Sequence, residues 1–161
     1  MRWAVKAIAT VGFVGYVPRA PGTAGSLAGL LVGLLTAPAV KDPHPYPLGL
    51  LIGVVACFFL GVAVSTRAER EFGVHDPRPV VIDECWAMWA ILVAAPLLCH
   101  AWPLTVVAFG VFRAFDIAKP FPLKDLGRLP GGWGIMLDDL GAAGYTVLVL
   151  WVVLALLRAP L

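Results

Sequence analysis

The chain has 161 residues, of which 60% are hydrophobic and 14% are charged, and its formal net charge is +2. Soluble globular proteins carry about 25% charged residues, so this composition, with a mean hydropathy of +0.89, indicates a membrane protein. The low net charge and the lack of a Lys/Arg run argue against a nucleic-acid partner. The length suits a single membrane-embedded domain over residues 1–161.

Five apolar segments are predicted as helices, near residues 24–40, 47–65, 86–98, 103–112 and 140–157. The second and the last approach the roughly 20 residues that cross a bilayer. The two short middle segments are predicted to form a tight helical hairpin around a break at 99–102. Residues 3–17 are expected to lie at the membrane interface. The predicted fold is therefore all-α, a small polytopic bundle with four to five membrane-embedded helices.

Charge predicts the orientation of these segments. If the N-terminus is cytoplasmic and all five segments cross, ten of the twelve basic residues face the cytoplasm, the exceptions being Lys41 and Arg158. Such an asymmetry normally sets topology. Nine of the ten acidic residues lie on the same side, Asp42 being the exception. Both signs of charge thus gather on one face, which predicts an active site that faces the cytoplasm.

The run PGTAGS at 21–26 opens the first long segment. A helix N-terminus attracts anions, and the hydroxyls of Thr23 and Ser26 can donate to a phosphate. In the alternative interpretation, one of these residues is an N-cap after a Pro-Gly turn, which stabilises the helix by about 1 kcal/mol.

A second cluster combines one histidine with three acids, His75, Asp76, Asp83 and Glu84. Carboxylate oxygens are ligands that Mg²⁺ prefers, so Asp83 and Glu84 are candidates to bracket an ion near a helix end. The alternative is a pair of first-turn acids that favour the helix dipole by about 0.3–1 kcal/mol each. For His75, the alternative is an ordinary hydrogen bond within a loop.

Arg113, Asp116 and Lys119 recur at intervals of three, and on a helix they form one stripe that Pro120 ends. After ten apolar residues, this stripe favours two cations for a phosphate and one acid for a metal. Ordinary salt bridging between neighbouring turns, worth about 0.2–0.5 kcal/mol per pair, is the alternative.

The run PGGWGIMLDD at 130–139 places three glycines just before Asp138 and Asp139. One of these acids could serve as an N-cap. The other would then repel it by roughly 4 kcal/mol at 4 Å and a surface-like dielectric. A bound cation would remove this repulsion.

With these motifs in view, the chain resembles the bacterial phosphatidylglycerophosphatase A family almost from end to end. The shared runs are PGTAGSLAGLL at 21–31, GVHDP at 73–77, VVIDE at 80–84, FRAFDIAKPFP at 112–122 and GGWGIMLDD at 131–139. The resemblance implies a Mg²⁺-dependent lipid phosphatase of phospholipid biosynthesis in the inner (cytoplasmic) membrane. Its expected reaction converts phosphatidylglycerophosphate to phosphatidylglycerol and inorganic phosphate.

With this resemblance, roles can be given to the candidate residues as a hypothesis. One or two Mg²⁺ ions would be held by four carboxylates, those of Asp83, Glu84, Asp138 and Asp139. Asp116 would be a further ligand or a base. The sequence leaves open the number of ions, the choice between water attack and a phosphoenzyme, and the oligomeric state.

The phosphate would be bound by two cations and two hydroxyls, those of Arg113, Lys119, Thr23 and Ser26. His75 and Asp76 would orient water or protonate the leaving glycerol oxygen. A rival hypothesis is a small membrane transporter or ion-coupled subunit that uses the acids to bind ions. It predicts polar residues within the spans, whereas these acids gather at the ends of the spans.

Overall fold

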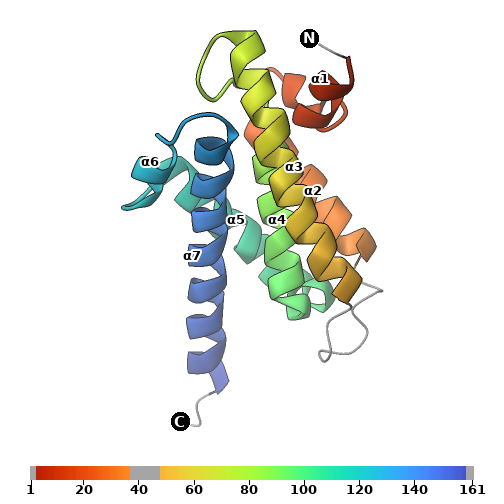
Figure 1. Cartoon of the computed structure of the whole chain (residues 1–161). Coiled ribbons are helices and arrows are strands. Elements are labelled where there is room, and N and C mark those ends of the chain that lie inside the picture. Colours follow the sequence, from red (N-terminus) through yellow and green to blue (C-terminus); the bar gives the residue numbers. More distant parts are fainter. Residues whose placement is uncertain (1–2, 37–47, 159–161) are drawn as a thin grey trace.

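The computed structural model describes residues 3–36 and 48–158. This part of the chain contains seven α-helices, two 3-10 helices and no strand, which confirms the all-α prediction (Figure 1). In chain order the elements are α1 (Trp3–Ala9), η1 (Val14–Tyr16), α2 (Pro21–Thr36), α3 (Leu48–Phe72), α4 (Ile82–Ala94), η3 (Pro96–His100), α5 (Trp102–Ala118), α6 (Leu123–Leu126) and α7 (Gly132–Arg158). Lys41, Asp42 and the end of the predicted 24–40 segment lie outside the described residues.

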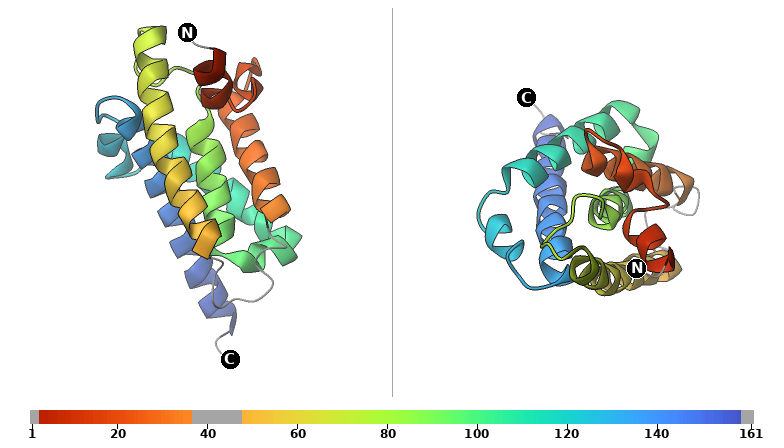
Figure 2. Two further views of the ribbon diagram at one scale, coloured as in Figure 1. Left: turned by 45° about the vertical axis from the view of Figure 1, so that its right-hand side comes forward. Right: turned by 90° about the horizontal axis from the view of Figure 1, so that it is seen from above.

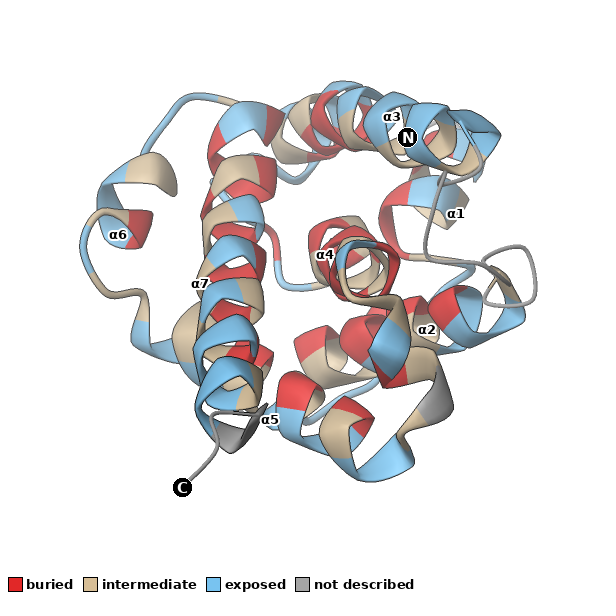
Figure 3. Cartoon of the chain, turned by 90° about the horizontal axis from the view of Figure 1, so that it is seen from below, coloured by how far each residue is buried: buried red, intermediate tan, exposed pale blue. Residues whose placement is uncertain are grey.

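Helix α4 stands at the centre of the bundle, and the other long helices surround it (Figures 2 and 3). Its residues Ala87, Met88 and Ile91 are completely buried, as is Phe112 of α5. A helix that is apolar on nearly all sides has to be enclosed by other helices. The acidic doublet in the first turn of α4 is thereby held inside the bundle rather than on its surface.

Helices α2 and α4 pack closely because one face of α2 consists of glycines. A Cβ at Gly25 would lie 2.7 Å from the Val81 Cβ, and a Cβ at Gly29 would overlap the Cys85 carbonyl. Small residues at such spacing let helix backbones approach each other, as in membrane helix pairs. The run that the sequence suggested as an anion site therefore also packs α2 onto α4.

Two helices, α3 and α7, are long and apolar enough to cross a membrane. Each contributes a 25-residue segment, with mean hydropathies of 2.6 and 1.9, and only 28% of each apolar window is buried inside the protein. The core helix of a soluble protein would be mostly buried. The structure thus identifies two candidate spans, whereas α2, α4 and α5 have 16, 13 and 17 residues.

Several helix boundaries differ from the prediction. Helix α3 continues past the predicted end at 65 to Phe72, and Gly73, with φ of +69°, ends it. Helix α7 begins at Gly132 rather than near 140. Helix α2 begins at Pro21, so the alternative in which Thr23 or Ser26 is an N-cap is wrong. The predicted break between the two middle segments is correct, because η3 joins α4 to α5 there.

Candidate active site

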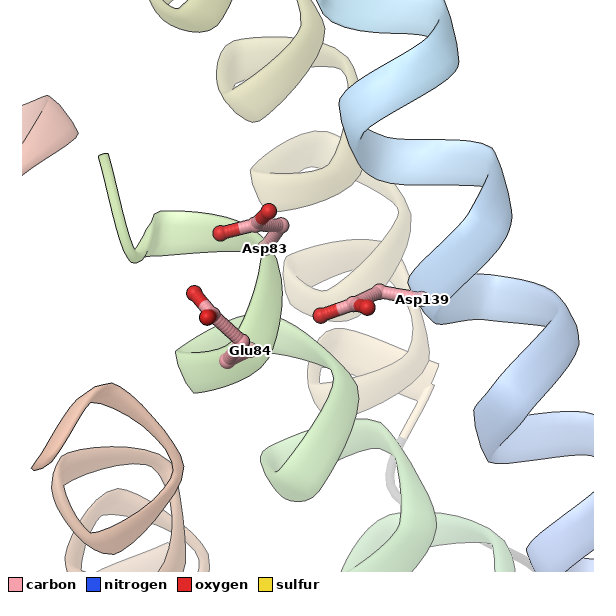
Figure 4. A group of neighbouring side chains, drawn as sticks. All are labelled: Asp83, Glu84 and Asp139. Atoms are coloured by element: carbon pink, nitrogen blue, oxygen red, sulfur yellow. The ribbon is translucent and has the colours of Figure 1, made fainter. Parts of the chain in front are cut away.

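Three carboxylates from two helices converge inside the bundle (Figure 4). Asp83 and Glu84 lie in the first turn of α4, and Asp139 lies on α7. One oxygen of each lies within 4.8 Å of the others. Asp83 is 6% exposed and Asp139 is 2% exposed. We call these three residues the carboxylate cluster.

The cluster has fewer hydrogen-bond partners than its buried oxygens require. One buried oxygen of each residue, Asp83 Oδ1, Glu84 Oε2 and Asp139 Oδ2, has no hydrogen-bond partner in the described structure. Buried carboxylates without partners are costly, and three together repel one another. Oxygen ligands from two or three carboxylates suit a hard divalent cation such as Mg²⁺. The residues present therefore fit a metal site.

A contact with α3 fixes the position of α7 along its own axis. The Gly132 N–H donates to Thr66 Oγ1 at 2.8 Å, and a Cβ at Gly132 would overlap the Val62 carbonyl. Only glycine permits this approach of the two backbones. The glycine run before the second acidic doublet thus positions Asp139 against α4.

Asp138 does not belong to the carboxylate cluster, although it is the neighbour of Asp139. Adjacent helical residues point about 100° apart, and Asp138 forms an ion pair with Lys119 instead. Lys119 caps the end of α5 in the left-handed region, with φ of +41°. Burial alone would lower the pKa of Lys119, but the hydrogen bond and the charge of Asp138 raise it above its usual range. Lys119 is therefore a fixed cation.

Arg113 links three of the predicted site elements. It forms an ion pair with Asp116 on the same helix, and its Nη1 lies 3.9 Å from Glu84 Oε1 and 3.4 Å from Ser26 Oγ. Gly22 of α2 lies against this group, because a Cβ there would be 3.1 Å from Arg113 Nη1 and would overlap Glu84 Oε1. The start of α2, the start of α4 and the end of α5 therefore meet at one point.

A cavity of about 960 Å³ opens beside this meeting point. Glu84 lines it from the carboxylate cluster, and Thr23 and Asp76, two of the candidate site residues, line it too. Its charged lining residues are Arg19, Asp76, Arg78, Glu84, Arg113, Asp116 and Lys119. Cations and carboxylates in one cavity are suited to a phosphate and its metal ion.

Two of the candidate site residues, Ser26 and His75, do not line the cavity. Ser26 is completely buried, and its hydroxyl donates to the Gly22 carbonyl of the same helix at 2.9 Å and lies near Arg113. His75 donates through Nε2 to the Gly127 carbonyl at 2.8 Å, and its Nδ1 lies 3.3 Å from Glu69 Oε1. These bonds match the alternative interpretation of His75 as a residue that holds a loop.

Sequence reasoning missed Arg19 and Arg78, which also line the cavity. Each stands next to a predicted motif, before PGTAGS and after GVHDP. Their position beside these motifs was the one feature of the sequence that could have indicated them. Each is one exposed arginine in a loop, so sequence alone could not separate them from ordinary topology-setting charges.

Fold and site together define an all-helical protein with a buried carboxylate cluster beside a cationic cavity, the arrangement of a phosphoryl hydrolase. The sequence matches the model of the family described as phosphatidylglycerophosphatase A over residues 7–154. The chain belongs to the phosphatidylglycerophosphatase A family. This match confirms the predicted resemblance and the prediction of an enzyme, a phosphatase, and it does not favour a transporter.

Relatives of similar length support this assignment. The chain is 41% identical to phosphatidylglycerophosphatase A of Haemophilus influenzae over 89% of this chain and 85% of that protein. It is 35% identical to phosphatidylglycerophosphatase A of Escherichia coli, over 82% and 73%. It is also 33% identical to a putative phosphatidylinositol-3-phosphatase of Bacteroides thetaiotaomicron, over 86% and 89%. No solved structure matches the chain.

Proposed function

We propose that this protein is a Mg²⁺-dependent phosphatidylglycerophosphatase, which hydrolyses phosphatidylglycerophosphate to phosphatidylglycerol and inorganic phosphate. The observation that carries this proposal is the convergence of Asp83, Glu84 and Asp139 beside a cavity lined by Arg113 and Lys119. Family membership and the names of the two relatives from Haemophilus and Escherichia support the substrate.

The carboxylate cluster would hold the metal ion. When bound, Mg²⁺ supplies positive charge against the phosphoryl oxygens and favours deprotonation of water. The unpartnered oxygens of Asp83, Glu84 and Asp139 are the candidate ligands. Asp138 contributes through Lys119 rather than as a direct ligand, because its carboxylate is bonded to that side chain.

Arg113 and Lys119 would bind the phosphomonoester. Phosphoryl transfer spreads charge over the equatorial oxygens, and fixed cations stabilise this charge without reorganisation. Both cations are held in place by a carboxylate, Arg113 by Asp116 and Lys119 by Asp138. Their side chains are thus oriented before the substrate arrives.

Two further cavity residues would assist the reaction. The Thr23 hydroxyl can donate to a phosphate oxygen, and the Asp76 carboxylate can accept a proton from water or return one to the leaving glycerol oxygen. Asp76 has a positive φ of +50°, a backbone strain typical of functional loops. His75, fixed between Gly127 and Glu69, would hold this loop against α3 and the end of α6 rather than contact the phosphate.

The protein would sit in the bacterial inner membrane as a multi-pass bundle with its site facing the cytoplasm. Two helices meet the length of a span, and the shorter α2, α4 and α5 would be embedded beside them. Basic residues gather in the loops around the cavity, as the positive-inside rule predicts for the cytoplasmic side. The acyl chains would then stay in the bilayer during the reaction.

The test is phosphate release from phosphatidylglycerophosphate by the purified full chain in neutral detergent micelles, with and without Mg²⁺. We expect release that requires Mg²⁺ and that falls at least 10³-fold in Asp83→Asn and Asp139→Asn, because each change removes a charged ligand. Asp125→Asn is the matched control, since Asp125 pairs with Arg128 on the surface of α6.

Two results would contradict the proposal. Phosphate release at the full rate without Mg²⁺ would show that the enzyme does not depend on magnesium. Full turnover in Asp139→Asn, with the protein folded and Mg²⁺ present, would remove the carboxylate cluster from the reaction. Ion flux in vesicles without hydrolysis would support a transporter instead.

A further inference from the structure

Arg19 and Arg78 differ from the other two cations of the cavity. Arg113 and Lys119 each form an ion pair with a carboxylate. Within the described residues, the guanidinium groups of Arg19 and Arg78 form no ion pair or hydrogen bond, although both line the same cavity. Both side chains are exposed. These two arginines therefore offer free donors to whatever enters.

The two pairs of cations come from different walls of the cavity. Arg113 lies on α5 one turn before its last turn, and Lys119 is the C-cap of that helix. Arg19 precedes α2, and Arg78 lies in the loop between α3 and α4. The segments that carry these two arginines pack together, because a Cβ at Gly15 would overlap the Pro79 carbonyl. We call the two segments that carry Arg19 and Arg78 the loop wall. The cations of α5 are fixed by ion pairs, and those of the loop wall are free.

The position of the carboxylate cluster identifies the end of the cavity at which the metal ion would bind. Glu84 lines the cavity near Gly22 and Arg113, so the metal end lies where α2, α4 and α5 meet. Arg19 and Arg78 come from the loop wall. A ligand with its reacting group at the metal end shares this cavity with two unpaired guanidinium groups.

Phosphatidylglycerophosphate carries two phosphates, a terminal monoester and a diester that joins glycerol to the lipid. We propose that Arg19 and Arg78 form a subsite for the phosphodiester, while Arg113 and Lys119 bind the monoester. This inference rests on the proposed function. A guanidinium group matches the geometry of a phosphate through paired N–H donors, and a diester has two non-bridging oxygens that can accept from such donors.

The subsite determines which phosphate is cleaved and which lipids are accepted. With the diester held on the loop wall, the monoester reaches the metal end. A lipid phosphate without a diester, such as phosphatidic acid, gains nothing from the two arginines. The arginines are therefore specificity-determining residues and do not take part in bond breaking.

The experiment compares the wild-type chain, Arg19→Gln, Arg78→Gln and the double variant in neutral detergent micelles. The first measurement is the kcat and KM for phosphatidylglycerophosphate. The second is equilibrium binding of fluorescent phosphatidylglycerol, which has the diester but no monoester. The third is inhibition by inorganic phosphate, which can occupy the monoester site alone. Arg128→Gln is the charge-matched control, because Arg128 does not line the cavity.

We expect each single variant to raise the KM for the lipid and to weaken phosphatidylglycerol binding by about tenfold, the effect of one charge-assisted hydrogen bond. The kcat and the inhibition by inorganic phosphate should stay at the wild-type values. The control should match the wild type in all three measurements.

Three outcomes would overturn the subsite. They are phosphatidylglycerol binding that is unchanged in the double variant, equal weakening of inorganic phosphate inhibition, and an equal effect in Arg128→Gln. Absence of phosphate release by the wild type would instead refute the proposed function. The binding measurement needs no hydrolysis, so it tests the diester subsite in that case too.

Discussion

Asp139→Asn should stabilise the protein without metal and destabilise it with Mg²⁺. Asparagine has nearly the same shape as aspartate but carries no charge. The change therefore removes repulsion inside the carboxylate cluster and removes a ligand at the same time. Few other substitutions in this bundle would reverse the sign of their effect on unfolding when a cation is added.

The magnitude follows from the cluster geometry. At 4.8 Å, the largest separation of the three oxygens, two unit charges repel by about 3.5 kcal/mol at an effective dielectric of about 20. Asp139 faces two such partners, Asp83 and Glu84. Binding of a proton by one carboxyl removes part of this repulsion, so we expect a net gain of about 2 kcal/mol. That gain raises the thermal midpoint by about 4–8 °C in a chain of this size.

Mg²⁺ should reverse the order. A ligand at a hundred times its Kd stabilises the folded state by about 2.7 kcal/mol, and the wild type receives this gain while the variant loses most of it. The assay is thermal unfolding of detergent-solubilised protein in EDTA and in a Mg²⁺ series. Asp125→Asn should follow the wild type in both conditions, since its carboxylate lies on the surface.

Lower stability of Asp139→Asn in EDTA would refute the reasoning, because it would show that Asp139 is stabilised by partners rather than repelled by its neighbours. A wild-type midpoint that does not respond to Mg²⁺ would refute it as well.

Three further predictions concern the cation, the helix contact and the loop. Lys119→Ala should lower kcat/KM by about 10²-fold, as expected for loss of a fixed charge in the transition state; an unchanged value in steady-state assays would reduce Lys119 to a structural partner of Asp138. Gly29→Ala should destabilise the bundle by about 1–3 kcal/mol or more in thermal unfolding, because its Cβ would overlap the Cys85 carbonyl. Gly110→Ala, with open space around the added Cβ, should be neutral or stabilising in the same measurement. The hydrogen bond to Gly127 and the charge of Glu69 raise the pKa of His75, although partial burial opposes them. The folded state thus binds this proton more tightly than the unfolded state. His75→Gln should therefore cost most stability below the ordinary histidine pKa, and the difference in stability between variant and wild type should vanish as pH rises through the folded-state pKa. A constant difference across a pH series of unfolding curves would contradict this.

The sequence predicted the helical class and the two candidate spans, because long apolar segments of about 20 residues are typical of helices. It also brought the two acidic doublets into one hypothesis, because both stand beside apolar segments on the same predicted side of the membrane. It assigned both Asp138 and Asp139 to the metal, because their different surroundings depend on how α7 is placed against α4 and α5. The start at Gly132 is fixed by a tertiary contact with Thr66 and Val62 of α3, which no local pattern contains.

The same limit explains the residues at the cavity. Arg113 and Lys119 were predictable from a helical stripe, since their spacing is local. Arg19 and Arg78 come from separate loops that meet through the packing of Gly15 against Pro79. His75 looked like a catalytic group by its type and its acidic neighbour, but the loop turns it toward Gly127 and Glu69.

The enclosure of α4 has a kinetic consequence. Of the three carboxylates, Glu84 lines the cavity, while Asp83 and Asp139 lie almost fully shielded behind it. An ion that enters from the cavity must pass Glu84 before it reaches the inner pair. A lipid head group seated in the cavity would obstruct that passage. Ordered addition follows, with the cation first and the lipid second, and excess substrate should slow reactivation of chelator-treated protein.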